Sequence, residues 1–183
     1  APTNPMLQVP DIEAIVALAA RHDVTTVLDN TFGGLHNHGQ YEIDYFVHSL
    51  TKYASGHGDV MGGVVITAEA NLAKLKPWSI NMGATMDPGV AFLILRGLRT
   101  YYLRYRRHSE TALVIAKSLQ ANARVKRVFY PGLPDDPGYA LAQQQMEDCG
   151  GVLSFDLDAD KDRTRALIDA LELFSTTSSL GST

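Results

Sequence analysis

Two apolar segments of the sequence end in side chains that could perform chemistry together. The first apolar run ends in the carboxylate of Asp29. The next run ends in two hydroxyl groups and an amine, which belong to Ser49, Thr51 and Lys52. Asp29 and Lys52 are 23 residues apart, which is too far for one element but suits two neighbouring strands. The spacing therefore predicts an acid and an amine at the ends of adjacent strands.

Both apolar runs are short, and a glycine-rich segment separates them, which is typical of buried strands in a parallel sheet. In open α/β sheets, ligands bind at the carboxyl ends of such strands. We therefore expect Asp29, Ser49, Thr51 and Lys52 to converge on one site.

An acid, two hydroxyls and an amine are groups that pyridoxal phosphate (PLP) requires of a protein. Lys52 would hold the cofactor as a Schiff base and move protons on the substrate. Asp29 would keep the pyridine nitrogen protonated, and it would stay ionised because the opposite charge outweighs desolvation. The hydroxyls of Ser49 and Thr51 would bind the phosphate. Taken singly, such a lysine is more often a solvated surface residue, and such an aspartate often caps a turn or helix.

Segments spread along the whole chain resemble the Cys/Met-metabolism (transsulfuration) PLP enzymes. This family includes cystathionine γ-synthase, cystathionine γ- and β-lyases, methionine γ-lyase and O-acetylhomoserine sulfhydrylase. The resemblance lies in Ala1–Pro5, Leu28–Phe32, His48–Tyr53, Gly56–Gly63, Leu95–Thr100, Tyr130–Leu133, Gly150–Phe155 and Ser179–Gly181. It implies the α/β architecture of fold-type I PLP-dependent transferases. Residues 1–110 would be part of the large parallel or mixed-sheet domain, and residues 111–183 part of a small α+β domain.

The resemblance also implies the roles of individual residues. Lys52 would be the Schiff-base lysine and Asp29 the partner of the pyridine nitrogen, with Ser49 and Thr51 at the phosphate. Asn4 would hydrogen-bond the ring oxygen of the cofactor, and Ser179 would hold the substrate carboxylate through its backbone. The residues alone would make Asn4 a turn residue beside proline and leave Ser179 as a possible polar strand end.

The implied reaction is carbon–sulfur γ-elimination or γ-replacement on cystathionine, homoserine esters or methionine. Some β-lyases of the family resemble Tyr-Ser-Trp-Gly where this chain has Ser178–Gly181, which favours γ-chemistry. Cystathionine β-lyase or O-acetylhomoserine sulfhydrylase activity is the alternative. Because family members carry further N-terminal and C-terminal parts, we expect a fragment of a homo-oligomer, dimer or tetramer, with shared active sites. A truncated remnant that oligomerises without activity is the alternative of another class.

Composition excludes several other classes of function. The net charge of −4 and the pI near 5.8 leave no basic surface for nucleic acid. The single cysteine, Cys149, excludes an internal disulfide framework, fits a reducing compartment and is expected to be a packed thiol. We see no apolar run of about 18 residues and no signal peptide, so no membrane partner and a cytoplasmic location are expected.

A histidine-rich segment offers a rival site of another class. His36 and His38 form a His-x-His pair, and His48, His57 and Asp59 follow in the sequence. Imidazole is a common metal ligand, so a zinc hydrolase is conceivable. No Glu-containing histidine motif and no Cys-x-x-Cys accompanies these residues, and we predict no metal site.

The expected elements surround these motifs. A helix follows the N-cap Asp11, with Ile12, Ile15 and Leu18 on its inner face. Strands are predicted at 25–28, 43–48 and 60–67, a helix at 68–76 that Pro77 ends, and a long helix at 89–121, bent near Gly97. Strands at 125–130, 151–157 and 173–178 should then alternate with helices at 139–147 and 162–171. The basic residues Arg104, Arg106, Arg107 and His108 are expected on a solvated helix face or a subunit contact.

Overall fold

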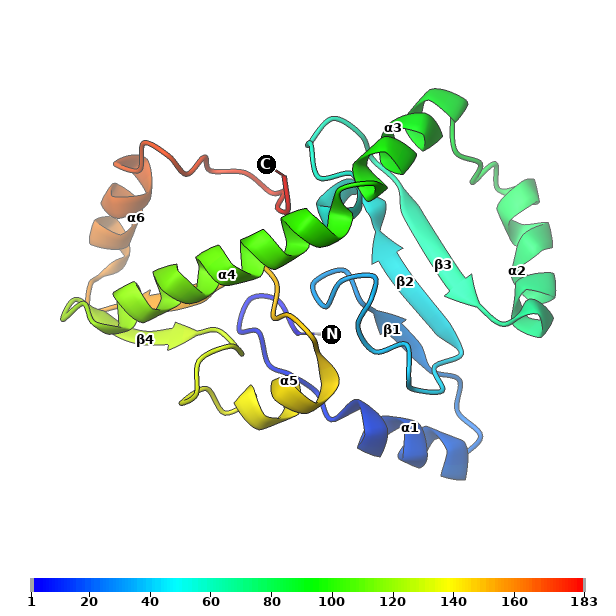
Figure 1. Cartoon of the computed structure of the whole chain (residues 1–183), viewed down its shortest axis with the longest axis horizontal. Coiled ribbons are helices and arrows are strands. Elements are labelled where there is room, and N and C mark those ends of the chain that lie inside the picture. Colours follow the sequence, from blue (N-terminus) through cyan, green and yellow to red (C-terminus); the bar gives the residue numbers. More distant parts are fainter. Residues whose placement is uncertain (1, 183) are drawn as a thin grey trace.

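The computed structural model describes residues 2–182 as a mixed α/β chain (Figure 1). The elements, in chain order, are α1 (Ile12–Arg21), β1 (Val27–Asp29), β2 (Tyr45–Ser49), η1 (Leu50–Ala54), β3 (Gly63–Thr67), α2 (Glu69–Asn81), α3 (Pro88–Leu98), α4 (Tyr101–Gln120), β4 (Val125–Phe129), α5 (Tyr139–Gln145), β5 (Ser154–Leu157) and α6 (Lys161–Asp169). Helix α4 extends from the side of the sheet of β1, β2 and β3 to the antiparallel pair of β4 and β5 (Figure 1).

The first sheet has the order β1-β2-β3 and confirms the predicted parallel pairing of its first two strands. Asp29 pairs with Val47, so the end of β1 lies beside the end of β2. Strand β3 runs antiparallel to β2, which makes the sheet mixed. The predicted burial is wrong for β1, where Val27 is 65% exposed, whereas the residues of β2 are half-buried and His48 is buried.

The turn that carries Lys52 follows β2 directly. It is the single π turn η1, and Lys52 itself departs from helical geometry, with φ −89° and ψ −126°. Leu50 and Ala54, on either side of the lysine, pack with Val60 of the following loop and Ile94 of α3 in one hydrophobic cluster. Apolar contacts therefore anchor the turn and leave the lysine side chain out of the core.

The predicted long helix is two helices, because α3 ends at Leu98 and α4 begins at Tyr101. The expected bend near Gly97 lies beside this break. Asp87 caps α3 by accepting hydrogen bonds from the backbone of Gly89 at 2.8 Å and Val90 at 3.2 Å. Gly97 packs directly on the backbone of the Lys52 turn, since a Cβ there would meet the carbonyl oxygen of Ser55.

We expect Gly97→Ala to lower the free energy of unfolding by about 3 kcal/mol, because backbone atoms cannot move aside for the added methyl group. Alanine would otherwise stabilise the helix by about 1 kcal/mol relative to glycine, so the sign of the change is diagnostic. Urea denaturation measures it. Gly39→Ala is the matched control, since a Cβ at Gly39 has no atom within 4 Å and should change stability by less than about 0.5 kcal/mol.

Three other predictions about the elements are wrong. On α1 only Ile12 is buried, while Ile15 and Leu18 are about half exposed because no described element covers them. Helix α2 continues through Pro77. None of its residues is buried, so water can reach the carbonyl that proline leaves unpaired. Residues 173–178 form no strand, and Leu173 is 94% exposed.

The part of the chain after α4 builds a second core on the same helix. Strands β4 and β5 pair antiparallel, and the residues that pack between them and α4 include Ala112, Ala116, Val128, Tyr130 and Leu133. The expected alternation of strands and helices is confirmed as far as α6. The proposed domain boundary at residue 110 falls inside α4 and stays a prediction.

Candidate active site

A cavity of about 440 Å³ opens where β1 and β2 end. The residues that line it are Pro2, Thr3, Asn4, Asp29, Thr31, Phe32, Ser49 and Lys52. Three separate segments thus meet there: the N-terminal segment, the end of β1 and the β2–η1 junction. The structure brings together Asn4, Asp29, Ser49 and Lys52, four of the six residues for which the sequence predicted a role.

Thr31 connects the two strand ends. Its backbone N–H donates to Oδ1 of Asp29 at 3.0 Å, and its Oγ1 accepts the backbone N–H of Ser49 at 2.9 Å. The carboxylate and the Ser49 backbone therefore hold fixed positions relative to each other. Sequence reasoning gave Thr31 no role. The available indication was its place two residues after an aspartate, where a backbone N–H commonly bonds the carboxylate.

Lys52 contacts Ser179, the fifth of the six predicted site residues, which lies near the C-terminal end of the chain. Its Nζ donates to Oγ of Ser179 at 3.2 Å, across 127 residues of sequence. The next residues fix this approach: Leu180 packs on a cluster that contains Tyr53, and Gly181, with φ +80°, leaves no room for a Cβ beside the Tyr53 backbone. The backbone N–H of Ser179, to which the resemblance assigns the substrate carboxylate, donates to Oγ1 of Thr177 at 3.2 Å.

Thr51 is not among the residues that line the cavity. Its Oγ1 accepts the backbone N–H of Gly62 at 3.0 Å and donates to the carbonyl of Gly62 at 3.4 Å. In this structure Thr51 ties the lysine turn to the loop before β3. Its role at a phosphate stays a prediction, as do the roles of the other five residues.

The charge in the cavity comes from Asp29 and Lys52. His48 lies buried next to Ser49, and burial lowers its pKa below the ordinary value, against a smaller opposite effect of the Asp29 charge. His48 is therefore neutral at pH 7 and does not compete with Lys52 for the carboxylate. The cavity presents one acid and one amine on otherwise uncharged walls.

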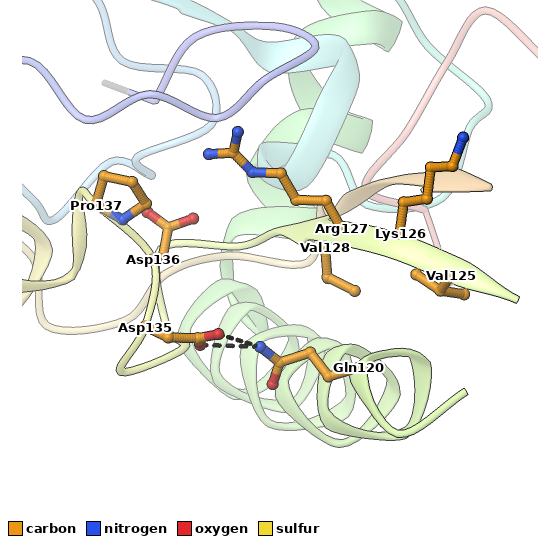
Figure 2. A pocket seen from close by; sticks show the side chains of 8 residues that line it. All are labelled: Gln120, Val125, Lys126, Arg127, Val128, Asp135, Asp136 and Pro137. Carbon is orange, nitrogen blue, oxygen red and sulfur yellow. Dashed lines mark hydrogen bonds between the residues drawn. The ribbon is translucent and has the colours of Figure 1, made fainter. Parts of the chain in front are cut away.

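A second cavity, of about 420 Å³, lies between the C-terminal end of α4, β4 and the loop after it (Figure 2). Figure 2 shows the amide of Gln120 facing Asp135, and its Nε2 donates to both carboxylate oxygens, at 2.9 and 2.7 Å. The ammonium of Lys126 is 2.9 Å from a carboxylate oxygen of Asp158. Asp136 accepts backbone N–H groups of Tyr130 and Gly138, and Arg127 lies over the ring of Phe129. None of the residues predicted to act in catalysis lines this cavity.

The rival hypotheses gain no support from the geometry. No three His, Cys, Asp or Glu side chains within residues 2–182 are placed to hold a metal ion. Burial raises the pKa of the Cys149 thiol to about 11, so the thiol stays protonated at neutral pH and packs in the core as expected. Over the same residues, no helix combines the length and the apolar character that crossing a membrane requires.

The polar groups of the strand-end cavity fit PLP. It combines an amine, a carboxylate, a hydroxyl and an amide, from Lys52, Asp29, Ser49 and Asn4. Its volume lies within the range of small-molecule sites, roughly 300–1,000 Å³. The cavity can therefore accommodate a compact aromatic aldehyde with a phosphate group.

Comparisons with known proteins agree with this geometry. A family model described as "Cys/Met metabolism PLP-dependent enzyme" matches residues 1–183. Over 98% of its length the chain is 42% identical to an L-methionine gamma-lyase of Pseudomonas deceptionensis and 37% identical to a cystathionine beta-lyase of Coxiella burnetii. The crystal structure of cystathionine gamma synthase from Xanthomonas oryzae pv. oryzae, in complex with aminoacrylate and cysteine, matches the whole chain with a TM-score of 0.95 at 39% identity. The chain covers 46–48% of these three proteins, so it spans about half the length of the relatives it matches.

Proposed function

The chain belongs to the Cys/Met metabolism PLP-dependent enzyme family, and on this premise we propose that it carries the lysine-bearing part of the active site of a sulfur amino-acid enzyme. The proposed reaction is carbon–sulfur γ-elimination or γ-replacement on cystathionine, homoserine esters or methionine. The observation that carries the proposal is the meeting of Asp29, Ser49 and Lys52 with Asn4 in one cavity at the strand ends.

Each residue has a definite part in this proposal. PLP, when bound, supplies a protonated ring that stores the electrons released from the substrate. Lys52 Nζ would anchor the cofactor covalently and, once the amino group of the substrate has displaced it, the free amine would take the proton from the α-carbon of the amino acid. The Asp29 carboxylate, oriented by the Thr31 N–H, holds the proton on the pyridine nitrogen. Ser49 and Thr51 donate to the phosphate, Asn4 donates to the ring oxygen, and the Ser179 backbone binds the substrate carboxylate.

The choice of γ-chemistry depends on the segment Ser178–Gly181, which lacks the Tyr-Ser-Trp-Gly pattern of some β-lyases. The names of the relatives span both branches, since they include methionine gamma-lyase, cystathionine gamma-synthase and cystathionine beta-lyase. Cystathionine β-lyase or sulfhydrylase activity is therefore the second candidate. Product analysis separates the two eliminations of cystathionine: γ-elimination gives cysteine, 2-oxobutanoate and ammonia, whereas β-elimination gives homocysteine, pyruvate and ammonia.

We also propose that the active protein is a cytoplasmic homo-oligomer with shared active sites. Large apolar side chains support the need for further polypeptide, because Met61, Leu103 and Leu173 are each at least 75% exposed. The alternative, an oligomerising remnant without activity, predicts the same association without turnover. Sedimentation together with an activity assay on cystathionine distinguishes the two.

One experiment tests the proposal on the chain itself. The protein is incubated with PLP, its visible spectrum is recorded before and after borohydride reduction, and the modified peptide is mapped. Attachment at Lys52 in preference to the other five lysines is expected. Attachment elsewhere, or equal labelling of all six, would refute the assignment.

A further inference from the structure

We propose that Arg104 is a positioning residue for Lys52, which holds the end of the lysine turn so that the amine faces the cavity. The inference rests on the proposed function of Lys52. The sequence predicted that Arg104 lies with Arg106, Arg107 and His108 on a solvated helix face or a subunit contact. The prediction of a solvated position is wrong for Arg104, whose guanidinium is partly buried against η1.

The carbonyl groups of the lysine turn accept from backbone N–H groups at some positions and from side chains at others. The carbonyl of Leu50 accepts the N–H of Ser55, and that of Lys52 accepts the N–H of Gly56. The carbonyls of Tyr53 and Ala54, at the C-terminal end of the turn, receive Arg104 instead: Nη1 donates to Tyr53 at 2.8 Å and Nη2 to Ala54 at 3.3 Å. Helix ends need such partners, and a cation is favoured where carbonyls point out.

The same guanidinium is itself held in place by Gly97 of α3 and by Thr100, the N-cap of α4. Nη2 donates to the carbonyl of Gly97 at 2.8 Å, and Nε donates to Oγ1 of Thr100 at 3.0 Å. Arg104 therefore joins the break between α3 and α4 to the turn that bears the lysine. Gly56, with φ +69°, lies against the same group, because a Cβ there would overlap Nη1 and Cζ of Arg104. The chain leaves room for a planar guanidinium at this point.

A lysine could not replace this residue. The planar fork of arginine presents donors in fixed directions, and Arg104 uses three nitrogens to reach four acceptors. An ammonium group would reach one or two of them. Arg104 contacts the turn at the carbonyls of Tyr53 and Ala54, so its effect on the Lys52 amine is transmitted through the backbone of these residues.

The test uses Arg104→Met and Arg104→Lys, with Arg107→Met as the matched control on the same helix. The Arg107 side chain is 79% exposed and contacts Glu110 in the adjacent turn. The first readout is amide hydrogen exchange at Ser55 and Gly56. We expect exchange at least about tenfold faster in Arg104→Met, an intermediate change in Arg104→Lys and no change in the control.

The second readout is reductive labelling with PLP and borohydride, expressed as labelling of Lys52 relative to the other five lysines. We expect this ratio to fall about tenfold in Arg104→Met, since the turn no longer fixes the amine. The amides of Ala112 and Ala116 in the core of α4 report whether the fold is intact. If Arg104→Met unfolds, Arg104→Lys decides by the same two measurements.

The outcomes are distinguishable. Faster exchange with an unchanged labelling ratio would reduce Arg104 to a structural residue and overturn the inference, as would unchanged values in both readouts. If the unsubstituted chain shows no preference for Lys52, the proposed function fails. Arg104 could then still stabilise the turn, and the exchange measurement alone would establish that.

Discussion

Replacing Lys52 with arginine is expected to abolish borohydride-stable attachment of PLP in the cavity and to slow the carbon–sulfur reaction by at least about 10³-fold. Arginine keeps the positive charge beside Ser179 but does not lose its proton in proteins, so it can neither anchor the aldehyde nor accept the α-proton. Mass spectrometry after reduction measures attachment. The rate is measured on cystathionine and methionine under conditions in which the unsubstituted protein turns over.

Lys74→Arg is the matched control for this substitution. Lys74 lies on the exposed helix α2, and its Nζ donates to Oδ1 of Asn71 in the preceding turn. Its replacement should leave both attachment and rate unchanged. Equal labelling of Lys52→Arg and the unsubstituted chain would show that another amine holds the cofactor. The strand-end cavity would then lose its assignment.

The site residues that the sequence predicted correctly to lie together are those at the ends of two strands that follow each other in the chain. Asp29 ends one strand and Ser49 ends the next, and a parallel pairing brings strand ends together whatever surrounds them. Lys52 follows within one turn, so it lies in the same place. Neighbouring residues on two paired elements therefore suffice to predict most of the cavity.

The contacts that the sequence did not predict join segments that are far apart. Lys52 meets Ser179 across 127 residues, and Arg104 meets Tyr53 across 51. No periodicity or turn chemistry encodes such pairs, because they depend on how α4 and the last residues pack on the turn. Arg104 looked like a solvated residue since its sequence neighbours are solvated, and only tertiary packing distinguishes it.

Wrong element predictions have the same physical origin. A proline inside a helix leaves a backbone carbonyl of the preceding turn without its hydrogen bond, which costs free energy. On the exposed helix α2, water can bind the carbonyl that Pro77 leaves unpaired and reduces that cost. A strand at 173–178 would need to pair with the edge of a sheet, and these residues pair with neither of the two described sheets. Residue propensities predicted a helix end at Pro77 and a strand at 173–178, but solvent at the helix and pairing between strands determined the structure.

Acidification from pH 7 to pH 4 is expected to remove about 3 kcal/mol of stability through His38 alone. The amide of Asn30 donates to the carbonyls of Gly34 and Asn37, so its Oδ1 must accept Nδ1–H of His38, 2.7 Å away. The remaining nitrogen, Nε2, is buried and finds no acceptor within residues 2–182. A second proton would therefore create a buried cation with an unpaired N–H.

Burial accordingly lowers the pKa of His38 to about 4, from about 6.5 in the unfolded chain. As the pH falls below 6.5, the unfolded state binds the proton first and the folded state loses stability, until the folded state also binds it near pH 4. Stability from this group is therefore complete above pH 6.5. His36, His48 and His108, whose pKa values burial also lowers, add changes of the same sign.

His38→Asn isolates the contribution of His38. Asparagine tolerates the φ of +69° at this position and can donate a hydrogen bond, but it does not titrate. Urea denaturation at several pH values from 7 to 4 should show the variant less stable at pH 7. Its stability should then fall by about 3 kcal/mol less than that of the unsubstituted chain, because it has no proton to take up. Parallel curves would mean that His38 binds its proton equally well folded and unfolded, and that the Asn30 contact does not enforce the neutral form.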